Sequence, residues 1–114
     1  MDEPRFLDDP AFKSLRAGDL DAYHQAIEDR DVVDFSGTDL RGVDFRAADL
    51  GKLVLRDAYL RDADLRGCDL RHIDLEGASL EAARINGAYF SDRLPAAEIR
   101  MSVDLGTRIR ARKA

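Results

Sequence analysis

The sequence contains one cysteine and two histidines, the residue types that most often act as nucleophiles or metal ligands. His72 follows Cys68 by four positions, while His24 lies far from both. A thiol beside an imidazole can support nucleophilic catalysis, and a metal ion would need three or four converging ligands. No such ligand set accompanies these residues, so the sequence predicts no metal site. His24 is expected to be a solvated or packing residue.

Carboxylates are the other groups that could do chemistry, because paired acids can act as general acid and base. Asp39, Asp44, Asp64 and Asp69 are each followed two positions later by arginine. This regular spacing favours a solvated, charge-balanced surface over an acid–base pair. The sequence also has no Ser/His/Asp arrangement and no phosphate-binding glycine loop. We therefore expect no catalytic residues, no cofactor and no enzymatic activity.

These residues are set in a strict five-residue repeat, which decides how they are positioned. From Phe35, every fifth residue is large and apolar for twelve consecutive units. The residue two before each of these centres is apolar or small, and the other three positions are mostly Asp, Arg and Gly. The centres are Phe35, Leu40, Phe45, Leu50, Leu55, Leu60, Leu65, Leu70, Leu75, Leu80, Ile85 and Phe90.

Neither regular secondary structure can bury such a pattern. On a helix, five residues advance about 140° around the axis, so the centres would spread over all faces. On a continuous strand, an odd step sends successive centres to opposite faces. The chain must therefore turn a corner in every unit, with the centres pointing inward. Five units end in glycine, which tolerates the positive φ that such corners use.

The units "TDLRG", "ADLRG", "CDLRH" and "IDLEG" resemble the A-[DN]-L-x-x consensus of the pentapeptide-repeat proteins. The resemblance covers residues 33–92. It implies a mainly β fold, a right-handed quadrilateral parallel β-helix of about three coils, with four repeats to a coil. In that frame Cys68 points inward as a small buried hydrophobe and His72 points outward, so the two side chains diverge.

Columns of residues twenty positions apart support four units per coil. Val33, Leu53 and Ile73 form one column of bulky aliphatic residues two before the centres, whereas the other three columns hold mainly small residues. Stacked coils at close-packed density need matching volumes above one another. The pattern therefore predicts that one side of the stack is bulkier than the others.

The open ends of a short stack must be covered, and the flanking segments have helical patterns. We expect one domain: an N-terminal helical cap over 1–32, the β-helix over 33–92, and a C-terminal helical cap with a basic tail over 93–114. Asp9-Pro10 and Asp19 are helix starts, and Gly18 is a stop. Pro95 suits the start of a third helix that ends at Gly106.

Two alternatives remain at the C-terminal end. The segment "VDLGT" at 103–107 also fits the five-residue frame, so the chain could rejoin the coil; the helix is favoured. The last residues, "RIRARKA", fit either an edge strand or a loose arm. Arginines alternate around Ile109 in this tail, which would suit a strand with one charged face.

Charge and composition limit the cellular compartments in which the protein is expected. Residues 1–32 carry nine acidic against four basic residues, residues 33–92 twelve against eight, and residues 93–114 two against six. An acidic front thus precedes a basic tail. No apolar run reaches the length of a membrane span, the first residues lack the pattern of a signal peptide, and a single cysteine forms no disulfide framework. We expect a cytoplasmic protein.

The outward positions that break the pattern are candidates for partner contact. Val54, Tyr59 and Tyr89 replace the aspartate before the centre, which predicts a small exposed apolar patch or a surface covered by a terminal segment. We expect a rigid protein–protein interaction or scaffolding module whose partner is unknown, present as a monomer or homodimer. Nucleic-acid binding by the tail is not expected.

The resemblance also implies one alternative function, since some pentapeptide-repeat proteins are acidic mimics of duplex DNA that bind gyrase, a type II topoisomerase. Such a mimic needs dense, uncompensated negative charge. The arginines two positions after the repeat aspartates largely neutralise that charge, and three coils make a short rod. The interaction module is therefore the favoured interpretation.

Overall fold

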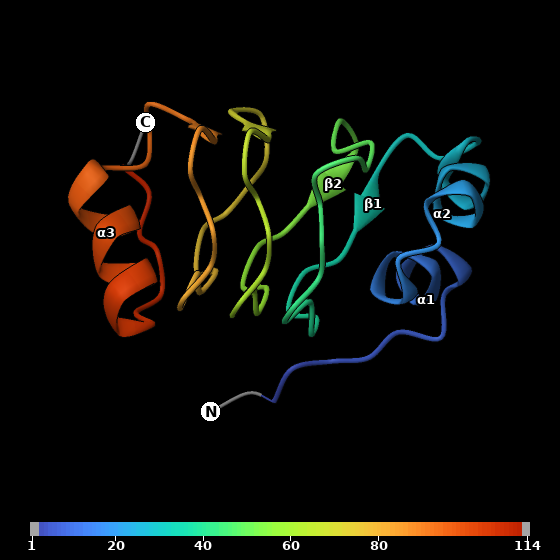
Figure 1. Cartoon of the computed structure of the whole chain (residues 1–114), viewed down its shortest axis with the longest axis horizontal. Coiled ribbons are helices and arrows are strands. Elements are labelled where there is room, and N and C mark those ends of the chain that lie inside the picture. The colour runs from blue at the N-terminus through green and yellow to red at the C-terminus, as the bar shows by residue number, and fades with distance from the viewer. Residues whose placement is uncertain (1–2, 113–114) are drawn as a thin grey trace.

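The computed structural model describes residues 3–112 and places helices at both ends of a stack of short parallel strands (Figure 1). The helices are α1 (Pro10–Ala17), α2 (Leu20–Ile27) and α3 (Ala96–Leu105). The strands are β1 (Val33–Asp34), β2 (Leu53–Val54), β3 (Asp69–Leu70) and β4 (Tyr89–Phe90). The third helix predicted from the sequence is therefore present, and residues 103–105 belong to it.

Strand pairing has a constant register of twenty residues. β1 pairs in parallel with β2 through Val33 and Leu53, and β3 pairs in parallel with β4 through Asp69 and Tyr89. Single parallel bridges with the same offset join further residues in between. We call residues 33–52, 53–72 and 73–92 the first, second and third coil. The five-residue segments that recur at this offset form four columns, which begin at residues 33, 38, 43 and 48.

The repeat centres fill the interior of this stack. Nine of the twelve are buried, and Leu50, Ile85 and Phe90 are half-buried against the same core. Cys68 is buried and His72 is exposed, as the repeat frame predicts. The fifth residue of eight units has a positive φ, including the non-glycine residues Asp57, Asp62 and Ala82. Left-handed corners thus recur even where glycine is missing.

The N-terminal helices act as a substitute for a missing coil. Asp9 and Asp19 cap α1 and α2 through their carboxylates, and Gly18 ends α1 in the left-handed conformation. From α2, the Tyr23 hydroxyl donates to the Asp49 carbonyl (2.9 Å) and the Asp49 N–H donates to His24 Nε2 (3.0 Å). Two backbone groups that another coil would satisfy are satisfied by side chains instead.

The C-terminal end is covered in the same way by α3 and the tail. Ser102 on α3 is fully buried, and its Oγ accepts the Leu80 N–H at 2.8 Å. The Ala82 N–H donates to the Val103 carbonyl at 2.9 Å. Gly106 ends α3 with a φ of 74°, after which the chain returns along the third coil.

Both terminal segments extend the second column. Arg5 forms a parallel bridge with Thr38 in the first coil, and Arg108 forms an antiparallel bridge with Ser79 in the third. Between them, Tyr59 bridges both neighbouring coils. Ile109 is fully buried beside this pairing. The tail is therefore not a loose arm over residues 106–112: it pairs through one isolated bridge at Arg108 and further backbone hydrogen bonds at Ile109 and Arg112, without forming a regular strand.

One side of the stack lacks backbone hydrogen bonds between the described residues of the first and second coil, and we call this region the open seam. In the described chain, no backbone hydrogen bond joins residues 47–52 of the first coil to residues 66–72 of the second. The corners at Ala47 and Lys52 are two of the four described corners at which the fifth residue of the unit lacks a positive φ; the others are at His72 and Asp92. A hollow of about 400 Å³ lies here, lined in part by Cys68 and by Leu50. Leu50 is half-buried because this seam is open.

Candidate functional site

The outer surface of the coils is built from a repeated Asp-x-Arg unit. In each unit the aspartate accepts the backbone N–H two residues on and a forked pair of bonds from the arginine side chain. At Asp44, these contacts are 3.0 Å to Arg46 N, 3.0 Å to Nε and 2.9 Å to Nη2. The same arrangement recurs at Asp39/Arg41, Asp64/Arg66 and Asp69/Arg71.

These contacts hold the carboxylates in the charged form. Hydrogen bonds from Arg66 and from its backbone, with Arg46 nearby, lower the pKa of Asp64 well below its usual value. Hydrogen bonds from Arg71 do the same to the pKa of Asp69. A carboxylate with a lowered pKa is a poor general base at neutral pH. The units therefore neutralise and order the walls, as the spacing of aspartate and arginine predicts.

The structure places the three candidate contact residues in three different columns. Val54 lies in the first column, where it pairs with Asp34, and is half-buried. Tyr59 lies in the second column and Tyr89 in the fourth. The three side chains are therefore distributed around the stack and do not gather on one side of it.

Tyr59 is covered by the tail. Arg108 lies over its ring at 5.1 Å from the centroid, and Arg108 Nη2 donates to the Tyr59 hydroxyl at 2.9 Å. Arg108 Nη1 also donates to the Gly77 carbonyl. A groove of about 680 Å³ runs past Tyr59 between Arg5 and Arg108. Of the two alternatives for the surface at Tyr59, an exposed patch or one covered by a terminal segment, the structure shows the covered one.

Tyr89 is the more accessible aromatic residue. Its side chain is 59% exposed on β4, and the Arg71 guanidinium lies 5.4 Å from its ring centroid. Arg71 is itself held by Asp69, so the cation over the ring is fixed in place. An aromatic ring and an arginine presented together are typical of the residues that dominate protein–protein contacts.

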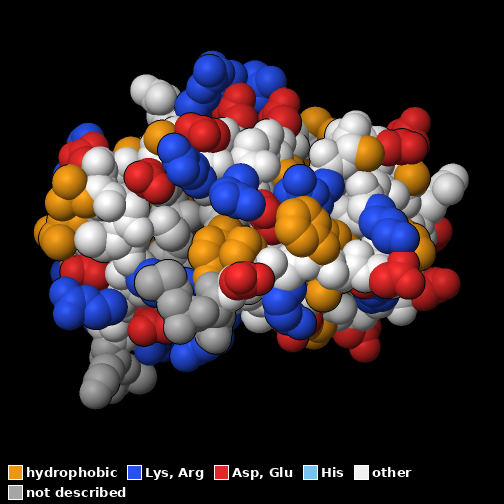
Figure 2. Space-filling view, turned by 90° about the horizontal axis from the view of Figure 1, so that it is seen from below, with side chains coloured by type: hydrophobic (Ala, Val, Ile, Leu, Met, Phe, Trp, Pro, Cys, Tyr) orange, Lys and Arg blue, Asp and Glu red, His pale blue; other side chains and the backbone are white. Residues whose placement is uncertain are grey.

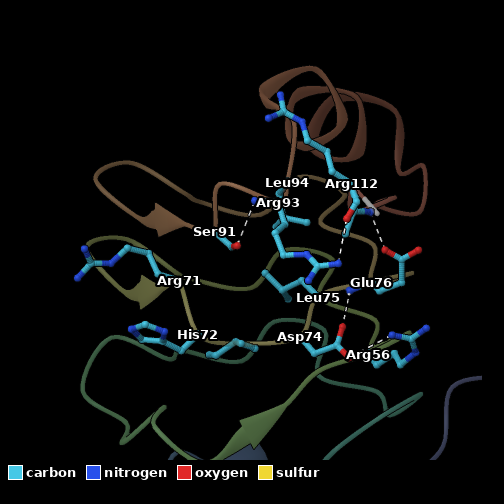
Figure 3. A pocket seen from close by; sticks show the side chains of 12 residues that line it. Arg56, Arg71, His72, Asp74, Leu75, Glu76, Ser91, Arg93, Leu94 and Arg112 are labelled. Carbon is cyan, nitrogen blue, oxygen red and sulfur yellow. Dashed lines mark hydrogen bonds and ion pairs between the residues drawn. The ribbon is translucent and has the colours of Figure 1, made fainter. Parts of the chain in front are cut away.

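A pocket of about 470 Å³ lies where the tail meets the third coil (Figure 3). Its polar groups hold the tail: Glu76 Oε2 accepts the Ala111 N–H at 2.6 Å, and Arg93 Nη2 donates to the Arg112 carbonyl at 3.0 Å. Asp74 pairs with Arg56 at 3.1 Å. His72 lies apart from this group (Figure 3), and Ser91 Oγ accepts the Arg93 N–H at 3.2 Å. The polar groups of the pocket therefore attach the tail to the third coil.

Two classes of site find no support in the part of the chain that the structure describes. Within residues 3–112, no three histidine, cysteine or carboxylate side chains are grouped to hold a metal ion. None of the helices there has the length and apolar character to cross a membrane. Cys68 Sγ faces the carbonyls of Phe45 and Arg66, and burial raises the pKa of its thiol. Cys68 is accordingly a core residue.

Comparison with known proteins decides the family. The model of pentapeptide repeats matches residues 33–60 and 54–92, with eight copies. The chain belongs to the pentapeptide repeat family. The matched residues are the three coils, and the family supports a β-helix fold and a non-catalytic role. No curated protein matches this chain.

One solved structure is similar to this pentapeptide repeat protein. It is the crystal structure of a pentapeptide repeat protein (Rfr23) from the cyanobacterium Cyanothece 51142, with 30% sequence identity and a TM-score of 0.47. The match covers 52% of this chain and 40% of that one, so the chain spans less than half of the length of that structure.

Sequence reasoning missed the residues that join the ends to the stack. Arg5 and Ser102 bond to backbone groups of the first and third coil, yet neither lies in the repeat. Ser102 had one available signal, since it is a polar residue between Ile99 and Val103, which both pack on the core from α3. Arg5 had none, because nothing in residues 3–9 has a strand pattern.

Proposed function

We propose that this pentapeptide repeat protein is a non-catalytic, rigid module that binds another protein through its outer surface. The winding in this proposal is right-handed and quadrilateral, with three coils, and residues 1–114 fold as one domain with caps over 1–32 and 93–114. A cytoplasmic setting, expected from the single cysteine, is part of the same proposal.

The observation that carries the proposal is the exposed pair of Tyr89 and Arg71 on the fourth column. The side chain of Arg71 is fixed by two bonds to Asp69, so a partner would meet a preorganised surface and would not have to order it. Tyr59 is occupied by Arg108 and Val54 is half-buried. Of the three candidate contact residues, Tyr89 is therefore expected to contribute most to binding.

A matched set of variants tests this proposal by quantitative affinity capture from the native cell extract. Tyr89→Ser should lose the bound protein, whereas Asp62→Asn, an exposed wall change elsewhere, should retain it. A tenfold loss corresponds to about 1.4 kcal/mol, within the range of a hot-spot residue. If Tyr89→Ser retains its partner as well as the unchanged protein does, the assignment of this surface is wrong.

The alternative, a DNA mimic that acts on a type II topoisomerase such as gyrase, gains no specific support. Four wall aspartates are each held by an arginine fork, and acidic and basic side chains alternate over the face seen in Figure 2. A gyrase supercoiling assay separates the two functions. Inhibition at stoichiometric protein would favour the mimic and overturn the interaction module.

A further inference from the structure

The end of the molecule formed by α1 and α2 carries an excess of negative charge, which Lys52, whose Nζ donates to the Ile27 and Glu28 carbonyls, offsets only in part. All three cations of residues 10–32 are already in ion pairs, which join Lys13 to Asp8, Arg16 to Asp39 and Arg30 to Asp9. Five exposed carboxylates of the same segment form no ion pair with any described residue. They are Asp19, Asp21, Glu28, Asp29 and Asp31.

The end formed by α3 and the tail has the opposite imbalance. Both carboxylates of residues 93–112 are in ion pairs, Glu98 with Arg110 at 3.1 Å and Asp104 with Arg100 at 4.0 Å. Arg93 and Arg112 are exposed and have no carboxylate partner among residues 3–112, whereas the Arg108 guanidinium reaches back to Tyr59 in the second coil. Two guanidinium charges are therefore left over at this end.

These two surfaces lie at opposite ends of the long axis. The molecule measures 36 × 27 × 26 Å, with α1 and α2 at one end of the 36 Å axis and α3 at the other (Figure 1). Acidic side chains gather at the α1–α2 end in Figure 2. We call these two surfaces the acidic end and the basic end.

Each end also exposes apolar side chains that the fold leaves uncovered. Val32, after α2, is 59% exposed at the acidic end. Met101 and Leu105 are four residues apart on α3, and they are 41% and 70% exposed. Apolar residues within a charged rim are the usual composition of a docking surface.

We propose that the protein associates with a second copy of itself end to end, the acidic end of one copy against the basic end of the next. Charge complementarity selects this arrangement, because two basic ends or two acidic ends would repel each other. Met101 and Leu105 would pack against the surface around Val32. The contact is heterologous and leaves one free acidic and one free basic end, so short chains form as the concentration rises.

Sedimentation velocity over a range of protein concentrations tests the association. Exposed charges are screened by salt, so the association constant should fall at least about tenfold from about 50 mM to about 0.5 M sodium chloride. A protein that stays monomeric at low salt, or an association that salt does not weaken, would overturn the proposal.

Two variants, each with one end disabled by substitution, test the polarity of the contact. Asp29→Asn with Asp31→Asn disables the acidic end, and Leu105→Ser with Arg112→Gln disables the basic end. Neither variant alone should associate, whereas an equimolar mixture should form a 1:1 complex and nothing longer, because one intact contact remains. Asp57→Asn with Asp62→Asn removes the same number of carboxylates from the coil corners and should leave association unchanged.

Other outcomes of the mixture contradict the polarity. If the acidic-end variant alone still dimerises, the contact is two-fold and formed by α3. If the coil-corner control dissociates as strongly as the acidic-end variant, net charge and not its location governs association. Circular dichroism of each variant checks that the fold is retained, and the basic-end variant provides an independent test if the acidic-end variant fails to fold.

Discussion

At the residue scale, the corner glycines are not equivalent. A Cβ atom on Gly77 would lie 1.9 Å from Asp57 Oδ1, whereas one on Gly42 would meet nothing within 4 Å. Both residues have a left-handed backbone, with φ values of 77° and 75°. The Asp57 side chain, stacked one coil away, would have to shift for a Cβ at Gly77 and not for one at Gly42, so it distinguishes two glycines whose backbones are alike.

We predict that Gly77→Ala destabilises the protein more than Gly42→Ala. The left-handed conformation costs either alanine about 1–2 kcal/mol, and Gly77→Ala adds the clash with Asp57. Urea unfolding of both variants measures the difference. In an Asp57→Gly background the clash is removed, so Gly77→Ala should then cost about as much as Gly42→Ala; an unchanged difference would contradict this explanation.

The inward and outward positions make a second prediction. Leu65 is fully buried in the second coil, and Leu65→Asp would bury a carboxylate without a partner, so we expect no cooperative unfolding transition. Arg66→Ala removes only a half-buried fork at the surface, leaves Asp64 its backbone hydrogen bond, and should change stability by about 1 kcal/mol. Thermal melts followed by circular dichroism compare them. Equal losses would mean that the assignment of inward and outward positions is wrong.

At the element scale, side chains of the helical caps form hydrogen bonds with backbone groups that a further coil would otherwise bond through its backbone. At one end, Tyr23 and His24 form hydrogen bonds with the carbonyl and the N–H of Asp49. At the other end, Ser102 accepts the N–H of Leu80. Burial in this joint raises the pKa of Tyr23 to about 12. The helices could be predicted from Asp9, Asp19, Pro95 and the apolar spacing, because those signals are local. Their docking could not, because it depends on which backbone groups the last coil leaves unsatisfied.

The tail segment after α3 is expected to contribute to stability through Ile109. This side chain is fully buried, its N–H donates to the Ala78 carbonyl at 2.9 Å, and its carbonyl accepts the Gly77 N–H at 2.8 Å. Ile109→Ala should therefore cost about 2–4 kcal/mol in the free energy of unfolding. Arg110→Ala is the control, since Arg110 is exposed, and should cost about 1 kcal/mol or less. Chemical denaturation measures both; similar values would show that the tail does not pack as described.

At the scale of the whole molecule, the wall aspartates predict how stability depends on pH. Hydrogen bonds from neighbouring arginines lower the pKa of Asp39, Asp44, Asp64 and Asp69 in the folded protein. A lowered folded pKa contributes stability that is present above the unfolded value near 4 and is lost as the pH falls through the folded value.

We therefore expect the urea midpoint to be level from about pH 7 to about pH 5 and to fall progressively below about pH 4. Asp44 and Asp69 are exposed and each contributes modestly, whereas Asp39 is buried and Asp64 half-buried, so the loss is cumulative and weighted toward these two. Arg66→Ala with Arg71→Ala should flatten this acid limb, since Asp64 and Asp69 would then titrate closer to their ordinary values. A midpoint that rises on acidification would contradict the wall pairs.

The features that follow the five-residue repeat could be predicted from the sequence, and those that depart from it or lie outside it could not. The centres, the Asp-x-Arg pairs and the divergence of Cys68 from His72 all follow from the five-residue frame. The open seam at 47–52 does not, since Leu50 fits the frame as well as Leu55 does, yet only Leu55 is fully buried. The alternating arginines around Ile109 pointed to an extended tail, but the column that Arg5 and Arg108 both join could not be predicted, because pairing between distant segments carries no periodic signal.

The constant offset between paired residues has a consequence for length. Removing residues 53–72 would bring Val33 beside Ile73 and Asp39 beside Ser79, with each remaining segment still above its counterpart and α3 still facing the same way relative to α2. Removing five or ten residues would bring unlike segments together and rotate one cap relative to the other. Viable relatives of different size should therefore differ by whole windings, so that twenty residues form the natural unit of insertion and loss.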